Sequence, residues 1–146
     1  MPTAMIIAVL IILEAFSKQH LLFSSLAGSA FLIYLDPKHP TNEVRTLTIS
    51  HMASAVIGYL VFFVAGPGYM AAAISMIIAI AVMIIAKAMH PPAVSTALIF
   101  AFQYTRMNTL MMFFFAVLLL AILIVLQRVS LWLINRSEAR SQKNNV

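Results

Sequence analysis

The chain has 146 residues, of which 63% are hydrophobic and 9% charged. Soluble domains are about 45–50% apolar and about 25% charged, so a soluble fold is excluded and lipid must cover part of this surface. The absence of cysteine excludes disulfides and thiol catalysis. The net charge of +5 comes without a basic patch interleaved with aromatic residues, which argues against nucleic acid as a partner.

Apolar stretches then follow one another along the chain, and they predict an all-α integral membrane protein. About six membrane-embedded helical segments are expected, two of them short compared with the ~20 residues that cross a bilayer. Residues 1–134 form this transmembrane domain, and residues 135–146 are expected to be a frayed, polar, cytoplasmic tail. The six stretches are Ala4–Phe16, Leu21–Leu35, Thr46–Ala65, Tyr69–Ala86, Ala93–Phe102 and Leu110–Leu133.

The breaks between the stretches contain proline and glycine. Gly66-Pro67-Gly68 predicts a tight turn between two long helices. At His90-Pro91-Pro92 a helix should end, because proline disfavours helical geometry in the residue before it. A new helix can begin there, because proline suits the first helical turn.

Two topologies are open, and the positive charges favour one of them. If all six segments cross, most Lys and Arg residues share a side with both termini, and Lys18 and Arg106 lie opposite. If the two short segments enter and return, the C-terminal cluster faces the other basic loops. Only the first arrangement obeys the positive-inside bias, so we expect a multi-pass protein of the inner or plasma membrane with both termini cytoplasmic. The residues sharing that side are Lys38, Arg45, Lys87, Arg136, Arg140 and Lys143.

The order of segment lengths also divides the chain into two similar halves. Gly28-Ser29-Ala30-Phe31-Leu32 in the first half parallels Ser95-Thr96-Ala97-Leu98-Ile99 in the second. Three crossings per half would give a 3+3 inverted repeat, which is typical of transporters. Small residues at helix contacts would produce the same likeness. A core of short helices also favours a homo-oligomer.

The third and fourth stretches contain basic residues that are costly in a membrane. Arg45 and His51 share one face of the third, and His51 is either a structural histidine or lines a polar path. Lys87 and His90, at the end of the fourth, either complement the helix dipole or attract an anion.

Hydroxyl groups lie near these basic residues in the predicted structure. Ser95 and Thr96 occupy the first turn of the short helix after the prolines, where free N–H groups attract anions. Ser29 lies in a small-residue segment with Gly28, which either packs closely or lines a passage. We therefore expect a small anion to contact Ser29, Arg45, His51, Lys87, His90, Ser95 and Thr96, with Gly28, Pro91 and Pro92 shaping the helix breaks.

Neither a metal site nor an enzyme active site is expected. The four histidines, at positions 20, 39, 51 and 90, lack the spacing of a metal motif. There is no G-x-S-x-G motif, and Glu14 is the acidic residue within the long apolar stretches. We expect no cofactor.

The motif Met89-His90-Pro91-Pro92-Ala93, followed by Thr96-Ala97-Leu98, resembles the signature of the HPP transmembrane family. Leu26-Ala27-Gly28-Ser29-Ala30 is similar to its F-G-A-S-A stretch, and His51 falls on its G-G-H position. The resemblance covers about Leu21 to Phe102. It departs from the family pattern where glycine or Gln-Pro is usual, at Ala27, Glu43-Val44, Ile49-Ser50 and Val94.

The resemblance implies a small integral membrane protein. Family members that resemble this chain are associated with nitrite transport across cyanobacterial and chloroplast membranes. The expected function is therefore a transporter or channel for a small monovalent anion, most specifically nitrite. The alternative is a membrane subunit or regulatory protein that transports nothing by itself, in which the same residues are structural.

Overall fold

In the computed structural model, the structure describes residues 20–102 and 109–144, with side chains described over 25–102 and 110–139. Every element in these ranges is helical, which confirms the all-α class. The expected stretch Ala4–Phe16, Lys18 and Arg106 lie outside the described residues. The elements are α2 (His20–Leu35), η1 (Pro40–Asn42), α3 (Val44–Ala65), α4 (Tyr69–Ile85), α5 (Ala93–Phe102) and α6 (Thr109–Asn144).

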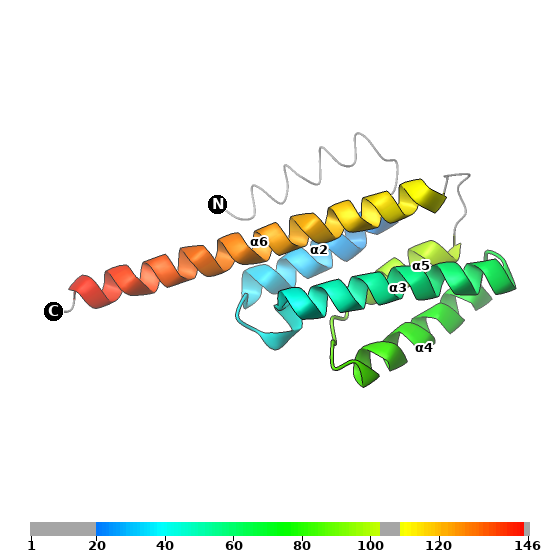
Figure 1. Cartoon of the computed structure of the whole chain (residues 1–146), viewed down its shortest axis with the longest axis horizontal. Helices are drawn as coiled ribbons and strands as arrows, with labels where there is room; N and C mark the ends of the chain where they lie inside the picture. Colours follow the sequence, from blue (N-terminus) through cyan, green and yellow to red (C-terminus); the bar gives the residue numbers. More distant parts are fainter. Residues whose placement is uncertain (1–19, 103–108, 145–146) are drawn as a thin grey trace.

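Helices α3 and α5 form the centre of the bundle (Figure 1). Helix α5 contacts α2, α3 and α4, whereas α3 contacts α4, α5 and α6. Helices α2 and α6 also contact each other. The short α5 is therefore surrounded by longer neighbours, and residues near its first turn can meet groups from several elements.

Small residues bring α3 and α5 unusually close together. A Cβ atom at Gly58 would lie 2.7 Å from Phe100 Cβ and would also collide with the Ala97 carbonyl. Phe100 and Ala97 are fully buried. This contact depends on the missing side chain, as is typical of helix packing in membranes.

Helices α3 and α6 are long and apolar enough to cross a bilayer. The ten residues of α5 rise only about 15 Å, about half of the hydrocarbon thickness. Helix α4 exposes large apolar side chains such as Met70, Ile77 and Ile85. In water this surface would favour association or aggregation, whereas lipid covers it at no cost.

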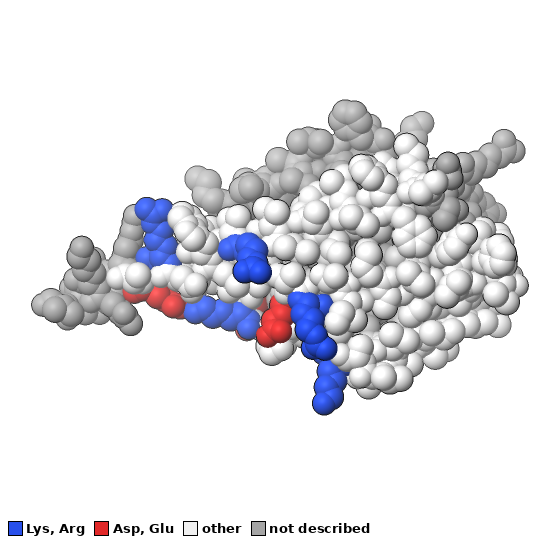
Figure 2. All heavy atoms as spheres, in the orientation of Figure 1, with Lys and Arg blue, Asp and Glu red and all other residues white. Residues whose placement is uncertain are grey.

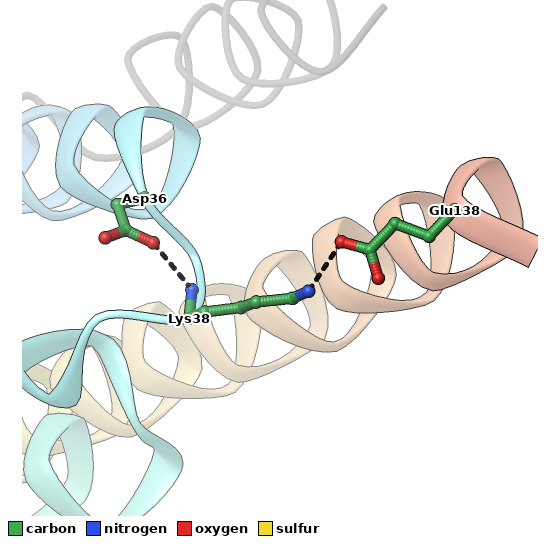
Figure 3. A network of polar contacts seen from close by, with 3 residues as sticks. All are labelled: Asp36, Lys38 and Glu138. Carbon is green, nitrogen blue, oxygen red and sulfur yellow. Dashed lines mark hydrogen bonds and ion pairs between the residues drawn. The ribbon is translucent and has the colours of Figure 1, made fainter. Parts of the chain in front are cut away.

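Helix α6 corrects the expectation of a frayed tail after residue 134. The helix continues through Asn144 without a break, because the polar segment is rich in good helix formers such as Glu138 and Ala139. Glu138 also reaches back to the loop after α2, where its Oε1 atom lies 2.7 Å from Lys38 Nζ (Figure 3). Both side chains are at least half exposed. Because water screens the attraction between them, this pair contributes at most about 1 kcal/mol.

The charged side chains gather at the end of the bundle from which the C-terminal part of α6 projects (Figure 2). We call this the charged end. The loop carrying Lys38 lies there, as its contact with Glu138 requires. The loop after α2 and the C-terminal part of α6 therefore lie at the same end of the bundle.

Candidate functional site

The break between α4 and α5 places His90 inside the protein. Helix α4 ends in a Schellman motif, in which Ala88 N–H donates to the Met83 carbonyl (2.9 Å) and Lys87 N–H donates to the Ile84 carbonyl (3.1 Å). Past the two prolines, Ala93 N–H donates to the His90 carbonyl (3.0 Å) and begins α5. His90 is fully buried between these two helix ends.

Lys87 occupies the left-handed position of this motif, with a φ of 50°. Lys87→Gly is expected to raise the free energy of unfolding by about 0.5–1 kcal/mol. The left-handed conformation costs a residue with a side chain about 1–2 kcal/mol, and the flexibility of glycine in the unfolded chain offsets about 0.5–1 kcal/mol.

Chemical unfolding in micelles, followed by circular dichroism, measures this effect. Ala86→Gly is the matched control, because Ala86 is right-handed, with a φ of −74°, and glycine there should destabilise. Equal losses of stability in the two variants would contradict the assignment of Lys87 to a capping position.

Two buried histidines and three buried hydroxyls form one connected group, which we call the His–Ser–Thr cluster: Ser25, Ser29, His51, His90 and Thr96. Ser29 Oγ lies 2.8 Å from His90 Nε2 and 3.3 Å from His51 Nε2. On the other side of the ring, His51 Nδ1 lies 3.1 Å from Thr96 Oγ1. Ser25 Oγ lies 3.1 Å from the same Thr96 oxygen and 3.0 Å from the Pro92 carbonyl oxygen.

Four separate parts of the chain build this cluster. Helix α2 supplies Ser25 and Ser29, which lie four residues apart and therefore on one face. Helix α3 supplies His51, the break between α4 and α5 supplies His90, and α5 supplies Thr96 in its first turn. The two imidazole rings are tilted by 53° with centroids 5.4 Å apart.

The outer end of the cluster is held by the loop at the charged end. His90 Nδ1 lies 2.9 Å from the Thr41 carbonyl oxygen. The loop itself is fixed by Asn42, whose amide Nδ2 donates to the Leu32 carbonyl (2.9 Å) and to the Asp36 carbonyl (2.7 Å). His39 Nδ1 accepts from Thr41 N–H at 3.2 Å and so holds Thr41 in place.

The structure brings together four of the seven residues predicted to contact an anion: Ser29, His51, His90 and Thr96. Arg45 and Lys87 are exposed at the bundle surface, and Ser95 is half-buried beside Thr96. Of the residues predicted to shape the break, Gly28 lies against the prolines, since a Cβ there would be 3.3 Å from Pro92 Cβ.

Two members of the site were missed by the sequence reasoning. Ser25 stood in the small-residue segment, and its spacing of four residues from Ser29 could have indicated a shared face. The Thr41 carbonyl belongs to the backbone, so no side-chain pattern marks it. Its role depends on how the loop folds back over the end of α4.

The cluster contains no acidic residue. Three acidic residues have described side chains, and all three are exposed: Asp36, Glu43 and Glu138. Within the described part of the chain, no three His, Asp or Glu residues are grouped to hold a metal ion. The chemistry available here is hydrogen bonding and proton exchange by neutral groups.

Comparison with known proteins supports a membrane protein. A transmembrane protein of Dictyostelium discoideum is 35% identical over 82 residues, a region that covers 53% of this chain and 26% of that protein. The matched region is thus about a quarter of the relative's length. No solved structure matches the chain. The family model described as the HPP transmembrane region matches residues 2–143, and the chain therefore belongs to the HPP transmembrane family.

Proposed function

We propose that this chain is a multi-pass transporter or channel for a small monovalent anion, with nitrite as the substrate. The observation that carries the proposal is the buried His–Ser–Thr cluster, which reaches the charged end through His90 and Thr41. A permeating anion needs hydrogen-bond donors to replace its water. Nitrite itself is taken from the resemblance to family members associated with its transport.

The exposed cations have a separate part in this proposal. Arg45 and Lys87 lie outside the cluster, so they raise the local anion concentration instead of binding the ion in the interior. Such attraction is long-ranged and screened by salt. A polar interior without fixed charge lets an anion leave again, whereas buried cations would trap it.

A buried hydroxyl without a partner adds support for a polar ligand. Ser54 Oγ is buried and, among the described residues, has no hydrogen-bond partner. It lies on α3 three residues after His51, so the two are neighbours along the helix. An unpaired buried hydroxyl costs about 1–3 kcal/mol, a cost that a ligand accepting its hydrogen bond would remove.

The helix contacts fit the 3+3 inverted repeat that we propose for this transporter. If α2 corresponds to α5 and α3 to α6, then the contact of α2 with α6 is the counterpart of the contact of α3 with α5. Both contacts are present. With positive residues inside, the charged end faces the cytoplasm, and the apolar outer face of α4 contacts lipid or a second copy in a homo-oligomer.

One observation favours the alternative of a non-transporting subunit. The groups of the cluster satisfy one another, so an anion must break bonds between Ser29 and the two histidines to enter. A satisfied polar network also serves to specify a unique packing. In that case the partner protein would bring the activity.

Anion uptake by proteoliposomes containing the purified chain tests the proposal. We expect uptake of nitrite to exceed uptake of nitrate, formate and chloride. In His90→Ala, nitrite uptake should fall at least about tenfold, because the loss of one hydrogen bond between neutral groups, about 1.4 kcal/mol, corresponds to a factor of ten. Ser50→Ala is the matched control. Ser50 is buried on the same helix as His51, and among the described residues its hydroxyl bonds only to the Thr46 and Leu47 carbonyls of that helix.

Two further variants separate the roles. Arg45→Ala should reduce uptake at low salt and have little effect at high salt, because the attraction is screened. Ser54→Ala should reduce uptake, because the proposal has its hydroxyl donate to the ion. Unchanged uptake in a more stable variant would show that the ion does not meet Ser54. Folded protein that moves none of the four anions would establish the subunit alternative in place of transport.

A further inference from the structure

We propose that the His–Ser–Thr cluster is a directional proton relay that couples proton movement to the proposed anion transport. The inference rests on the proposed function for its coupling, although the relay itself stands on the geometry of the cluster. Five side chains form an unbroken series of hydrogen bonds in the order Ser25, Thr96, His51, Ser29, His90, and the series ends on the Thr41 carbonyl.

The Thr41 carbonyl determines the direction of the bonds at His90. A carbonyl oxygen only accepts, so His90 Nδ1 must carry a proton and donate it to Thr41. In a neutral ring, Nε2 of His90 is then an acceptor, and the Ser29 hydroxyl must donate to it. Ser29 has a single proton, so the bond to His51 requires His51 Nε2 to donate to Ser29 Oγ.

The same reasoning continues to the inner end of the series. His51 protonated on Nε2 has Nδ1 as an acceptor, so the Thr96 hydroxyl donates to it. Thr96 Oγ1 can then only accept from Ser25, whose proton is shared between Thr96 and the Pro92 carbonyl. With the Ser25 proton shared in this way, the two neighbouring histidines are opposite tautomers, His90 with its proton on Nδ1 and His51 with its proton on Nε2. If Ser25 donated to the Pro92 carbonyl alone, Thr96 would donate to Ser25, and both rings would carry the proton on Nδ1. We assign the first arrangement, because it leaves the Ser29 proton wholly to His90, the nearer of its two partners.

The surroundings keep both rings neutral between transfers. His51 and His90 face each other, and His39 lies beyond Thr41 in the loop. Among the described side chains of the five helices and the loops between them, the remaining charged groups are exposed, namely Asp36, Lys38, Glu43, Arg45, Lys87, Arg128, Arg136 and Glu138. Within the described part of the chain, a buried imidazolium would have no carboxylate beside it, and an uncompensated buried charge is costly. A proton is therefore passed on and not retained.

One transfer conserves protons at each step. In the proposed transport, water that enters with the anion delivers a proton to Ser25 Oγ. Ser25 then passes its own proton to Thr96, Thr96 passes its proton to His51 Nδ1, His51 passes its Nε2 proton to Ser29, and Ser29 passes its proton to His90 Nε2. His90 then releases its Nδ1 proton to water at the charged end when the bond to Thr41 opens. All donors now point the other way and must turn before another proton can follow, so one proton passes in each cycle.

The tautomers provide the first test. Nitrogen NMR of the full chain in lipid nanodiscs, labelled with 15N in histidine, distinguishes protonated from bare ring nitrogens. Substituting each histidine in turn by Gln assigns the signals. We expect a proton on His90 Nδ1 and on His51 Nε2. The same tautomer in both rings, or a charged ring at neutral pH, would overturn the direction we assign.

Proton flux provides the second test. A nitrite gradient is imposed on proteoliposomes that contain a trapped pH-sensitive dye, and protein-free liposomes supply the background from nitrous acid crossing lipid unaided. We expect proton uptake together with nitrite uptake. Thr96→Val keeps the shape but removes the hydroxyl, and it should lower the ratio of protons to nitrite about a hundredfold, the scale of one proton-transfer group. Thr96→Ser should restore the ratio, and Ser50→Ala should leave it unchanged.

The outcomes separate the two proposals. Nitrite uptake without protons, or a Thr96→Val variant with the wild-type ratio, overturns the relay and leaves anion transport standing. Absence of any anion uptake by folded wild-type protein overturns the proposed function. Protons that then still move through wild-type protein, and not through Thr96→Val, support the relay as a path of its own.

Discussion

Gly58→Ala is expected to lower the free energy of unfolding by about 1–3 kcal/mol, the usual cost of overpacking a well-packed interior. The added methyl group would lie 2.7 Å from Phe100 Cβ, and neither Phe100 nor the α5 backbone can move away without separating α3 from α5. The higher helix propensity of alanine, worth about 1 kcal/mol, offsets only part of this cost. Unfolding by SDS in mixed micelles, followed by circular dichroism, measures the effect.

Gly28→Ala is the matched control for this substitution. A Cβ atom there would lie 3.3 Å from Pro92 Cβ, a tight contact that a small shift can relieve. We expect a change of less than about 1 kcal/mol, because the gain in helix propensity opposes the crowding. Similar losses for both glycines would contradict the closer approach at α3 and α5.

His51→Ala and His90→Ala are each expected to destabilise the protein by about 2–4 kcal/mol. Each truncation removes a hydrogen-bond partner from a buried hydroxyl group, at about 1–3 kcal/mol, and adds a cavity. Ser29 bonds to both rings, so the two substitutions remove partners of the same hydroxyl. The double variant should therefore lose less than the sum, by about 0.5–3 kcal/mol, as is found for residues in one network.

The same SDS unfolding of the two single variants and the double variant completes this cycle. Ser50→Ala again serves as the control, because its loss leaves only helix carbonyls that already accept backbone bonds. Additive effects of the two histidines would mean that Ser29 does not couple them. The relay would then lose its central link, although each histidine could still be structural.

These predictions concern contacts between residues that are far apart in the sequence. The sequence predicted the limits of some helices correctly and missed others. The limits of α5 were predicted at Ala93 and Phe102 and are confirmed, because two prolines mark the start and the apolar run marks the length. The turn at residues 66–68 follows from its glycines, one of which has a φ of 73°. The C-terminal limit of α6 was missed, because a polar composition does not prevent a helix from continuing when it is already formed.

The sequence by itself determined that this chain is helical, apolar and suited to a bilayer, because composition and proline positions act locally and do not depend on the fold. It also identified His51, His90, Ser29 and Thr96 as unusual residues for such an interior. Only the tertiary structure decided that these four meet, that Ser25 and the Thr41 carbonyl complete the series, and that Arg45 and Lys87 stay outside. Hydrogen bonds require their atoms within about 3 Å, and that distance is set by how α2, α3 and α5 pack, not by any spacing along the chain.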